Sequence, residues 1–355
     1  MTILQICAYA APYEGNFIKS LKALGNVYEK KGDKVVYAFP ESARNIPWCK
    51  ELEKHTDVYF LPLAKARIKI KTYTMLKDIY RKYKDLKIVH SHFELYDAPV
   101  ALTAPKGVKV FWHLHDALEG YTGLKYRLEH KVQYGFCHKN AILLSVSKKH
   151  MEYVQKKGFP KENARYIPNG VDTDRIKLVY TAVDQRKYDF LIFGWEFERK
   201  GVDLCIEALK KISNEKFLVA IVGSENTENI IKERYGYISG VEVVNPVSDI
   251  NELYEKSKCF LHISRAEGFS YALLEAVYAG LPVICSDISE NRFATQFPTV
   301  EMIESENVVG IAEKMKYIIN EKQYSKDIIE KSRKIIENKY SIACWVKNML
   351  KQYGE

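Results

Sequence analysis

Two glutamates, Glu267 and Glu275, stand eight residues apart in the stretch SRAEGFSYALLEAVYAGLPVICS, which runs from Ser264 to Ser286. The apolar run before it, Cys259–Ile263, predicts a buried strand, and Ser270 is a suitable N-cap for the helix that follows. Glu267 is therefore expected on the loop above the strand, beside backbone N–H groups of a helix start that attract phosphate and other anions. Glu275 is expected inside the helix, where a carboxylate among apolar side chains needs a partner. The simpler interpretation makes Glu267 a loop acid and Glu275 a solvent-facing residue.

A second candidate for anion chemistry is Lys200, which precedes Gly201 at a predicted helix start. The setting is a strand ending in Phe193-Gly194, then a loop, then a helix, which suits a contact between the lysine and a phosphate. Arg199 offers a further cation, although adjacent side chains often point apart. A Lys-Gly pair alone would indicate nothing, so this prediction depends on the strand, loop and helix around it.

The histidines allow a rival interpretation. His90-x-His92 and His113-x-His115, the latter followed by Asp116, each place two imidazoles on one face of a predicted strand. Two such strands side by side would suit a metal-dependent hydrolase, but that leaves the second half of the chain unexplained. Asp172-Thr173-Asp174 has a spacing known from metal sites; it follows Pro-Asn-Gly-Val, so local capping at a hinge is the better account.

The elements that must position these residues alternate between strand and helix, as in parallel α/β sheets. Predicted strands include 3–8, 35–39, 88–92, 108–114 and 141–146 in one series, and 190–193, 217–222, 241–244, 259–263 and 282–285 in another. We expect an N-terminal Rossmann-like domain over 1–168, a linker over 169–187, a second such domain over 188–338 and a terminal helix over 339–355. Two doubly wound halves predict a cleft between them in which strand ends bind a nucleotide.

Composition agrees with two globular domains. The chain has 355 residues, of which 47% are apolar and 28% charged. We expect no membrane-spanning helix and no signal peptide, because no apolar run is long enough and the N-terminus reads as a first strand. Seven scattered cysteines without a C-x-x-C pair indicate reduced thiols, and hence a cytoplasmic protein without a zinc site.

Positive charge gathers in the first half. Residues 1–170 contain 29 Lys and Arg against 16 Asp and Glu, whereas residues 171–355 contain 25 against 29. The densest segment, Lys65–Lys87, holds nine cations interleaved with apolar and aromatic residues. Such a segment is typical of a basic amphipathic helix on an anionic membrane surface; an ordinary solvated helix is nearly as good an explanation. No nucleic-acid motif accompanies the charge, so nucleic acid is not an expected partner.

The motifs together resemble a known family. Glu267 and Glu275 within S-R-x-E-G-F, followed by A-G-L-P-V-I and S-D, resemble the E-x7-E donor signature of the retaining nucleotide-sugar glycosyltransferases of family 4. Val222-Gly223-Ser224 and the linker-like Ile167–Asp172 are similar to further family segments, in the family's order. The resemblance implies the GT-B fold: two Rossmann-like doubly wound domains facing each other across a cleft, with a C-terminal helix that can return to the first domain.

The resemblance also implies roles for residues. Glu267, His115 and Lys200 would be catalytic, with Glu267 and His115 close to the transferred sugar and Lys200 at the diphosphate. Donor binding would fall to the following set: Gly15, Asn16, Arg199, Lys200, Gly268, Phe269, Ser270 and Glu275, the last at the ribose. The chain departs from the family at Trp195, where an arginine is usual, and at Glu14-Gly15-Asn16, where a Gly-Gly pair is usual.

The implied activity is transfer of a hexose or N-acetylhexosamine from a nucleoside diphosphate sugar, most commonly a UDP-sugar, to a hydroxyl of a saccharide or lipid-linked saccharide. We expect a metal-independent enzyme without a cofactor, in which Lys200 and backbone dipoles stabilise the departing diphosphate. Capsular or cell-envelope polysaccharide assembly, at the cytoplasmic face of a membrane, is the expected setting. The alternative is a pseudo-glycosyltransferase that acts as a binding or stabilising partner subunit; Trp195 and the incomplete glycine loop favour it.

Overall fold

The computed structural model describes residues 1–62, 70–115, 123–212, 217–322 and 324–354. The chain divides into two compact units: unit 1 consists of 1–170 and 342–355, and unit 2 of 171–341. The predicted boundary at 168/169 lies next to the observed one. Residues 171–187, which we expected to be part of a linker, are counted with unit 2.

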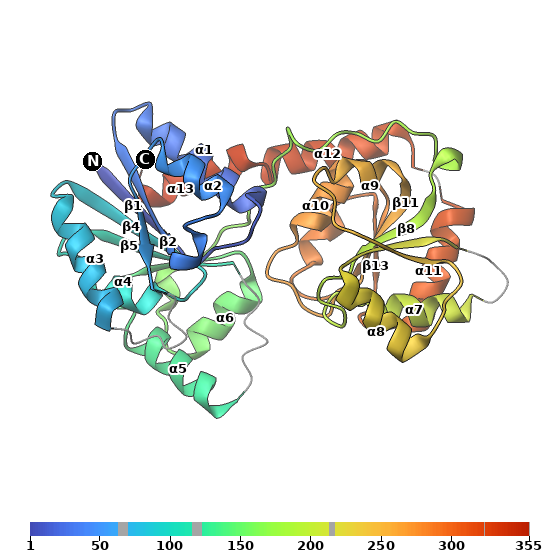
Figure 1. Cartoon of the computed structure of the whole chain (residues 1–355), viewed down its shortest axis with the longest axis horizontal. Coiled ribbons are helices and arrows are strands. Elements are labelled where there is room, and N and C mark those ends of the chain that lie inside the picture. Colours follow the sequence, from blue (N-terminus) through green and yellow to red (C-terminus); the bar gives the residue numbers. More distant parts are fainter. Residues whose placement is uncertain (63–69, 116–122, 213–216, 323, 355) are drawn as a thin grey trace. The chain divides into compact units, whose positions relative to one another are not determined.

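Unit 1 is built on a seven-stranded sheet in which every pair of neighbouring strands is parallel (Figure 1). Its spatial order, β3-β2-β1-β4-β5-β6-β7, reverses beside β1, which is the doubly wound arrangement. The strands are β1 Thr2–Cys7, β2 Lys34–Pro40, β3 Val58–Leu61, β4 Leu86–His92, β5 Lys109–Leu114, β6 Ile142–Ser145 and β7 Ala164–Tyr166. The helices are α1 Gly15–Glu29, α2 Pro47–Glu53, α3 Ile70–Lys82, α4 Asp97–Thr103, α5 Leu124–Gly135, α6 Lys148–Lys156 and α13 Ile342–Tyr353.

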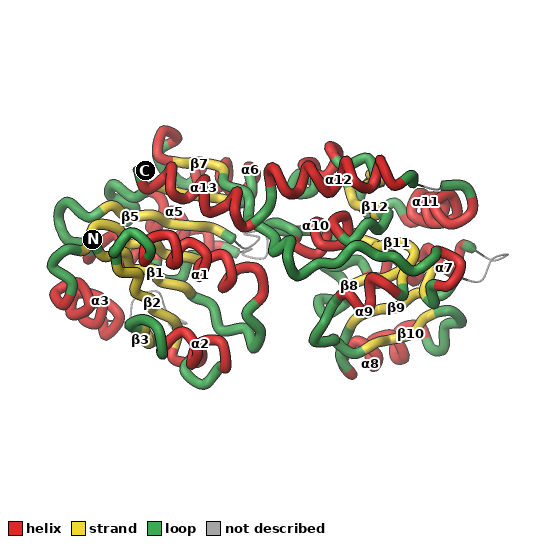
Figure 2. The backbone as a smooth tube through the Cα atoms, turned by 90° about the horizontal axis from the view of Figure 1, so that it is seen from above, coloured by secondary structure: helices red, strands yellow, loops and turns green. Residues whose placement is uncertain are grey.

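The last helix, α13, packs on unit 1 although it follows the whole of unit 2 in the sequence (Figure 2). Its apolar face, with Trp345, Val346 and Met349, joins the core cluster that also contains α1 and the central strands. Tyr353 near its end is buried and accepts a 3.0 Å hydrogen bond from Gln5 on β1. The expectation that the C-terminal helix returns to the first domain is confirmed.

Unit 2 repeats the plan with six parallel strands in the order β10-β9-β8-β11-β12-β13. The strands are β8 Tyr188–Phe193, β9 Val219–Val222, β10 Val241–Val244, β11 Ser257–His262, β12 Val283–Ser286 and β13 Val300–Ile303. The helices are α7 Val202–Lys211, α8 Glu225–Tyr235, α9 Asn251–Glu255, α10 Tyr271–Tyr278, α11 Val308–Asn320 and α12 Lys326–Lys339. Strands β8, β9 and β12 are buried along nearly their whole length, which explains their continuous apolar sequences.

Two Rossmann-like parallel-sheet units confirm the predicted fold class. Strands β3, β7 and β13 were not predicted; each is only three or four residues long and lies at the edge of its sheet. The membrane prediction for Lys65–Lys87 falls partly outside the described residues, which omit 63–69. From residue 70 on, α3 buries Leu76, Ile79 and Tyr80 in the core of unit 1 and exposes its cations, so its apolar face is already covered by protein.

Candidate functional site

The loops that follow β8 and β11 bring a carboxylate and two cations together in unit 2. The Lys200 ammonium donates a 2.7 Å hydrogen bond to Glu267, and an Arg199 guanidinium nitrogen lies 3.2 Å from the other carboxylate oxygen. His262, the last residue of β11, has its Nε2 3.9 Å from Glu267. The Glu267 side chain is buried and that of Lys200 is 12% exposed, whereas Arg199 is more exposed and also pairs with Glu196. Three residues that the sequence singled out separately thus form one cluster.

The cluster keeps Glu267 ionised. Burial by itself raises the pKa of this carboxyl, but the positive charges of Lys200 and Arg199 outweigh it and lower the pKa to about 2. The pKa of His262 falls to about 4, chiefly through burial. Near neutral pH the cluster therefore holds the cations of Lys200 and Arg199, the Glu267 carboxylate and a neutral imidazole, and Glu196, which pairs with Arg199, brings a second carboxylate.

Glycine at position 201 is required for this geometry. Gly201 has φ +76°, and a Cβ there would lie 2.3 Å from the carbonyl oxygen of Ile263. Only glycine allows the Lys200 loop to approach the end of β11 so closely. A 2.8 Å hydrogen bond from the Arg265 amide to the Arg199 carbonyl ties the two loops together.

Helix α10 begins directly after the cluster. Ser270 is its N-cap, as predicted, and its hydroxyl accepts a 3.2 Å hydrogen bond from the Leu273 amide. The backbone of Gly268–Ser270 therefore lies between the Glu267 carboxylate and a helix N-terminus, where the helix dipole favours an anion. The loops after β8 and β11 thus bring two cations and the start of α10 together, and this combination can stabilise a phosphate group.

Glu275 has the partner that its buried position requires. Its carboxylate accepts a hydrogen bond from Arg175 and lies 3.4 Å from the hydroxyl of Tyr254. Burial and the neighbouring Glu275 raise the pKa of Tyr254, so the phenol stays a donor. The alternative of a solvent-facing Glu275 is wrong, because the residue is only 6% exposed. The sequence analysis missed Arg175, since nothing in a loop one hundred residues away signals this pairing.

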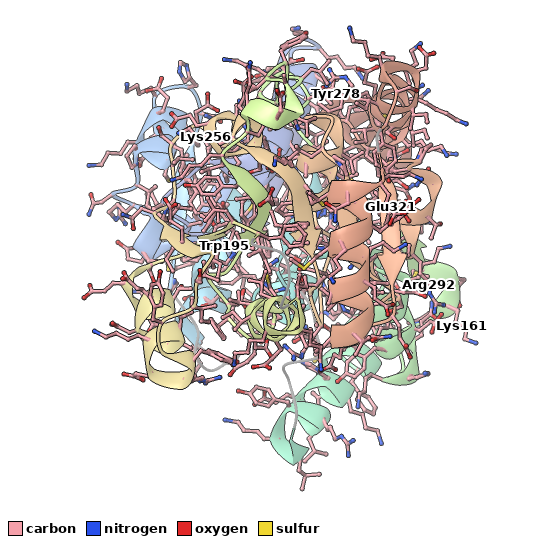
Figure 3. All side chains as sticks on the ribbon, turned by 90° about the vertical axis from the view of Figure 1, so that its right-hand side faces the viewer. Lys161, Trp195, Lys256, Tyr278, Arg292 and Glu321 are labelled. Carbon is pink, nitrogen blue, oxygen red and sulfur yellow. The ribbon has the colours of Figure 1, made fainter. Side chains whose placement is uncertain are left out.

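Trp195 occupies the position where the family usually has an arginine. Its indole is 52% exposed and stacks on Phe193 at a centroid distance of 4.9 Å (Figure 3). The side chain offers an aromatic face rather than a charge, and Lys200 and Arg199 supply the positive charge of this loop.

The predicted site residues of the first half lie in unit 1. Gly15 begins α1 with φ +58°, and Asn16 is buried in its first turn. His115 follows β5, is buried, and contacts the ring of Phe17 at 5.1 Å between centroids. These three residues lie around the start of α1, whereas the other predicted site residues belong to unit 2.

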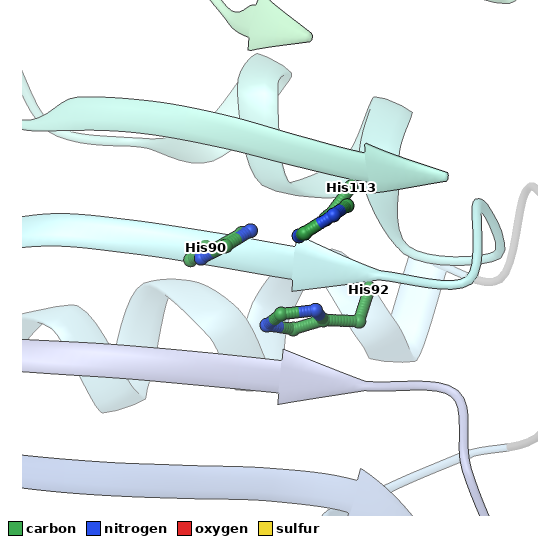
Figure 4. Close-up of side chains that lie close together, drawn as sticks. All are labelled: His90, His92 and His113. Atoms are coloured by element: carbon green, nitrogen blue, oxygen red, sulfur yellow. The ribbon is translucent and has the colours of Figure 1, made fainter. Parts of the chain in front are cut away.

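His115 is one member of a layer of four buried imidazoles on β4 and β5; Figure 4 shows the other three, His90, His92 and His113. Neighbouring rings stack, with centroid distances of 4.0 Å for His90–His92 and 4.1 Å for His113–His115. We call these four residues the imidazole layer.

Neutral groups hydrogen-bond to His90, His92 and His115, whereas both ring nitrogens of His113 and Nε2 of His90 are buried without a hydrogen-bond partner among the described residues. His115 Nδ1 lies 3.1 Å from the Asn169 side-chain oxygen, and its Nε2 lies 3.0 Å from His92 Nδ1. The other His92 nitrogen is 2.9 Å from Gln5, and His90 Nδ1 is 2.6 Å from the Tyr353 hydroxyl. Burial lowers the pKa of all four histidines, that of His115 to about 3. The layer is therefore uncharged near neutral pH.

The imidazole layer is also the place where the sequence suggested a metal. Nitrogens of His90, His92 and His113 lie within 4.8 Å of one another. Lone pairs of an imidazole lie in the ring plane, however, and rings stacked face to face 4.0 Å apart do not aim them at one point. Both nitrogens of His92 also have hydrogen-bond partners. The geometry favours a stacked, hydrogen-bonded layer over a set of metal ligands.

Asp116 lies outside the described residues. Asp172 caps its own turn through the amide of Asp174, as expected of a hinge.

Comparisons with known proteins agree with this division. Residues 19–175 match the model of glycosyltransferase family 4, and residues 180–335 match that of glycosyl transferases group 1. The capsular polysaccharide biosynthesis glycosyltransferase CapM of Staphylococcus aureus is 26% identical over 58% of this chain and 59% of its own length. The lipopolysaccharide glucosyltransferase WaaG of Escherichia coli is 29% identical over 36% of this chain and 35% of its own. These stretches span less than two thirds of either relative.

Among solved structures, HepE of Anabaena in complex with UDP superposes with a TM-score of 0.79 over 99% of both chains, at 15% sequence identity. At that identity the likeness establishes the fold. The chain therefore has the GT-B fold, and its first and second halves match models of a family 4 and a group 1 glycosyltransferase domain, in that order.

Proposed function

We propose that the chain is a glycosyltransferase that moves a hexose or N-acetylhexosamine from a nucleoside diphosphate sugar to a hydroxyl group of a saccharide or lipid-linked saccharide. The observation that carries the proposal is the cluster of Lys200, Arg199 and Glu267 beside the start of α10. Its two cations suit a diphosphate, and its buried carboxylate suits sugar hydroxyls. CapM and WaaG, both named as polysaccharide or lipopolysaccharide glycosyltransferases, support a role in polysaccharide assembly.

In the proposed reaction, the bond between the anomeric carbon and the diphosphate oxygen breaks while the acceptor hydroxyl oxygen bonds to the same carbon. The departing diphosphate gains negative charge, which Lys200, Arg199 and the amides of Gly268–Ser270 stabilise. The acceptor proton passes to the leaving phosphate on the same face of the sugar. This front-side displacement retains the anomeric configuration and needs neither a second carboxylate nor a metal ion.

Glu275 is the proposed ribose contact and Glu267 the proposed sugar contact. Glu275 is held in place by Arg175 and Tyr254, and a carboxylate can accept several hydrogen bonds at once. The roles implied for Gly15, Asn16 and His115 stay predictions. We propose UDP as the nucleotide, in line with the UDP and UDP-glucose complexes of HepE, and the cytoplasmic face of a membrane as the place of action. Across the described part of the chain, every helix is too short or too polar to cross a bilayer.

A thermal-shift screen with UDP, GDP, ADP and the corresponding sugars tests the proposal. A ligand at one hundred times its dissociation constant stabilises the folded state by about 2.7 kcal/mol. We expect a clear rise in the midpoint with one nucleotide and its sugars, and loss of that rise in Glu275→Gln. No response to any nucleotide would contradict the proposal and favour the alternative, a non-catalytic partner subunit.

A further inference from the structure

Helix α5 of unit 1 carries an exposed apolar stripe. In the part of the chain that the structure describes, fourteen large apolar side chains are exposed, and five of them lie between Leu124 and Phe136. Leu124, Leu128 and Val132 share one face of the helix, and Phe136 follows as its C-cap residue; they are 74%, 56%, 53% and 74% exposed. We call these four residues the α5 stripe.

The opposite face holds α5 in place with polar groups. His130 lies 2.8 Å from the Tyr153 hydroxyl of α6 and 3.1 Å from Glu94, and the Tyr134 hydroxyl donates to Glu94 at 2.7 Å. His130, Gln133 and Tyr134 are buried. The helix is therefore inverted relative to an ordinary surface helix: polar residues point into the protein and apolar residues point out. Among the described residues, packing of unit 1 leaves the stripe exposed.

Cations border the stripe. Lys125, Arg127 and Lys131 are exposed on the same helix, and Glu129 is its one acid. Residues 1–170 as a whole carry 29 cations against 16 acids. Lysine and arginine stems can lie along an apolar surface while their charged ends reach upward to phosphate groups.

We propose that the α5 stripe docks on an anionic membrane surface, with its apolar side chains among the acyl chains and Lys125, Arg127 and Lys131 at the lipid phosphates. A single amphipathic helix of this length and charge pattern suits an interfacial position. A second copy of the chain fits less well, because a two-fold contact through α5 would set the same cations against each other. The inference deepens the proposed function, since it names the surface that would bring the enzyme to a lipid-borne acceptor.

Vesicle co-sedimentation tests the proposal with the full chain and without nucleotide. One variant replaces the α5 stripe by Gln (Leu124→Gln, Leu128→Gln, Val132→Gln, Phe136→Gln). A second replaces the cations of α5 (Lys125→Gln, Arg127→Gln, Lys131→Gln). The matched control replaces three exposed cations of α3, whose apolar face is buried (Lys71→Gln, Lys77→Gln, Arg81→Gln).

We expect the wild type to sediment with phosphatidylglycerol-containing vesicles and much less with pure phosphatidylcholine. The stripe variant should bind at least tenfold more weakly at every salt concentration, and the α5 cation variant should lose binding at physiological salt. The α3 control should stay within about threefold of the wild type. Unchanged circular dichroism confirms that the variants fold.

Three results would overturn the proposal: a wild type that never sediments even at low salt, a stripe variant that binds like the wild type, or a dimer in sedimentation velocity that the stripe variant abolishes. A failure of the docking proposal can be told apart from a failure of the proposed function. A protein that docks on vesicles but binds no nucleotide would leave the docking surface standing, and one that transfers sugar to a soluble acceptor but never docks would leave the enzyme standing.

Discussion

Each unit has a polar cluster near the C-terminal ends of its central strands, and the two clusters differ in charge. In unit 2, the loop after β11 holds an ionised carboxylate between Lys200 and Arg199. In unit 1, the ends of β4 and β5 hold the imidazole layer, in which burial keeps the four rings neutral. The charged cluster can take part in reactions that build up charge, whereas the neutral layer can offer only hydrogen bonds and shape. Two units of the same fold can therefore carry different clusters: a charged one where cations lie beside a buried carboxylate, and a neutral one where burial keeps imidazoles uncharged.

The largest expected effect is a difference in acid sensitivity between the units. A histidine whose pKa is lowered in the folded state stays neutral there but takes up a proton on unfolding below its ordinary pKa of about 6.5. Its stabilising contribution is complete above that pH and is lost as pH falls, by about 1.4 kcal/mol per pH unit for each histidine. The imidazole layer supplies four such groups to unit 1, and His262 supplies one to unit 2.

Urea unfolding at pH 7.5, 6.0 and 5.0 measures this difference. Trp48, Trp112 and Trp345 belong to unit 1, so a Trp195→Phe variant restricts tryptophan fluorescence to that unit. We expect the unit 1 transition to move to lower urea between pH 6.5 and 5, and His113→Leu to reduce the movement. Glu267, with its pKa lowered to about 2, begins to cost unit 2 stability only below pH 4.5. An equal dependence of urea stability on pH in both units would contradict the expected difference in acid sensitivity.

Removal of the cation tests whether the charged cluster serves chemistry. Lys200→Met should lower turnover by about 10²- to 10³-fold, because one donor to the developing negative charge is lost. Circular dichroism should be unchanged, since Arg199 still neutralises Glu267. Arg199→Met is the matched variant. A comparable loss of turnover would show that Arg199 takes the role of the arginine that the resemblance implies at position 195. Near-normal turnover in Lys200→Met would contradict the assignment.

The two glutamates should separate binding from turnover. Glu275→Gln is expected to weaken nucleotide affinity about tenfold, because an amide is a poorer acceptor for ribose hydroxyls than a carboxylate. Glu267→Gln should lower turnover more than nucleotide affinity, since its proposed partner is the sugar. Isothermal titration measures the nucleotide affinity and initial rates measure the turnover of each variant. Unchanged nucleotide affinity in Glu275→Gln would contradict the ribose assignment.

The smallest expected effect is that of chelators. Excess EDTA or phenanthroline should leave both sugar transfer and the thermal midpoint unchanged, because His90, His92 and His115 are hydrogen-bonded to Tyr353, Gln5 and Asn169, and the stacked rings do not aim their nitrogens at one point. A fall in the midpoint would make the layer a metal site, and a fall in activity alone would contradict the metal-free mechanism.

Much of unit 2 was predictable because its signals are local. The strand before Ser264, the cap at Ser270 and the loop position of Glu267 all follow from neighbouring residues, and the structure confirms each. The pairing of Glu275 with Arg175 was not predictable, since it joins elements one hundred residues apart.

The two basic helices show a second limit of sequence reasoning. Basic and apolar residues alternate in α3 and α5 alike, but α3 buries its apolar face and α5 buries His130, Gln133 and Tyr134 instead. Hydrophobic periodicity places apolar residues inside by default. It therefore fails where polar neighbours such as Glu94 and Tyr153 hold the other face of a helix.

The return of α13 to unit 1 sets an order for biosynthesis. A ribosome completes unit 2, which is continuous from 171 to 341, before it makes the helix that unit 1 needs. Until then Gln5 and His90 lack the Tyr353 hydroxyl, and the apolar face of α1 lacks its cover. Nascent unit 2 can thus fold on its own, whereas unit 1 stays incompletely packed until residues 342–353 have been made. A fragment that stops at 170 should depend on a separately supplied 342–353 peptide to close.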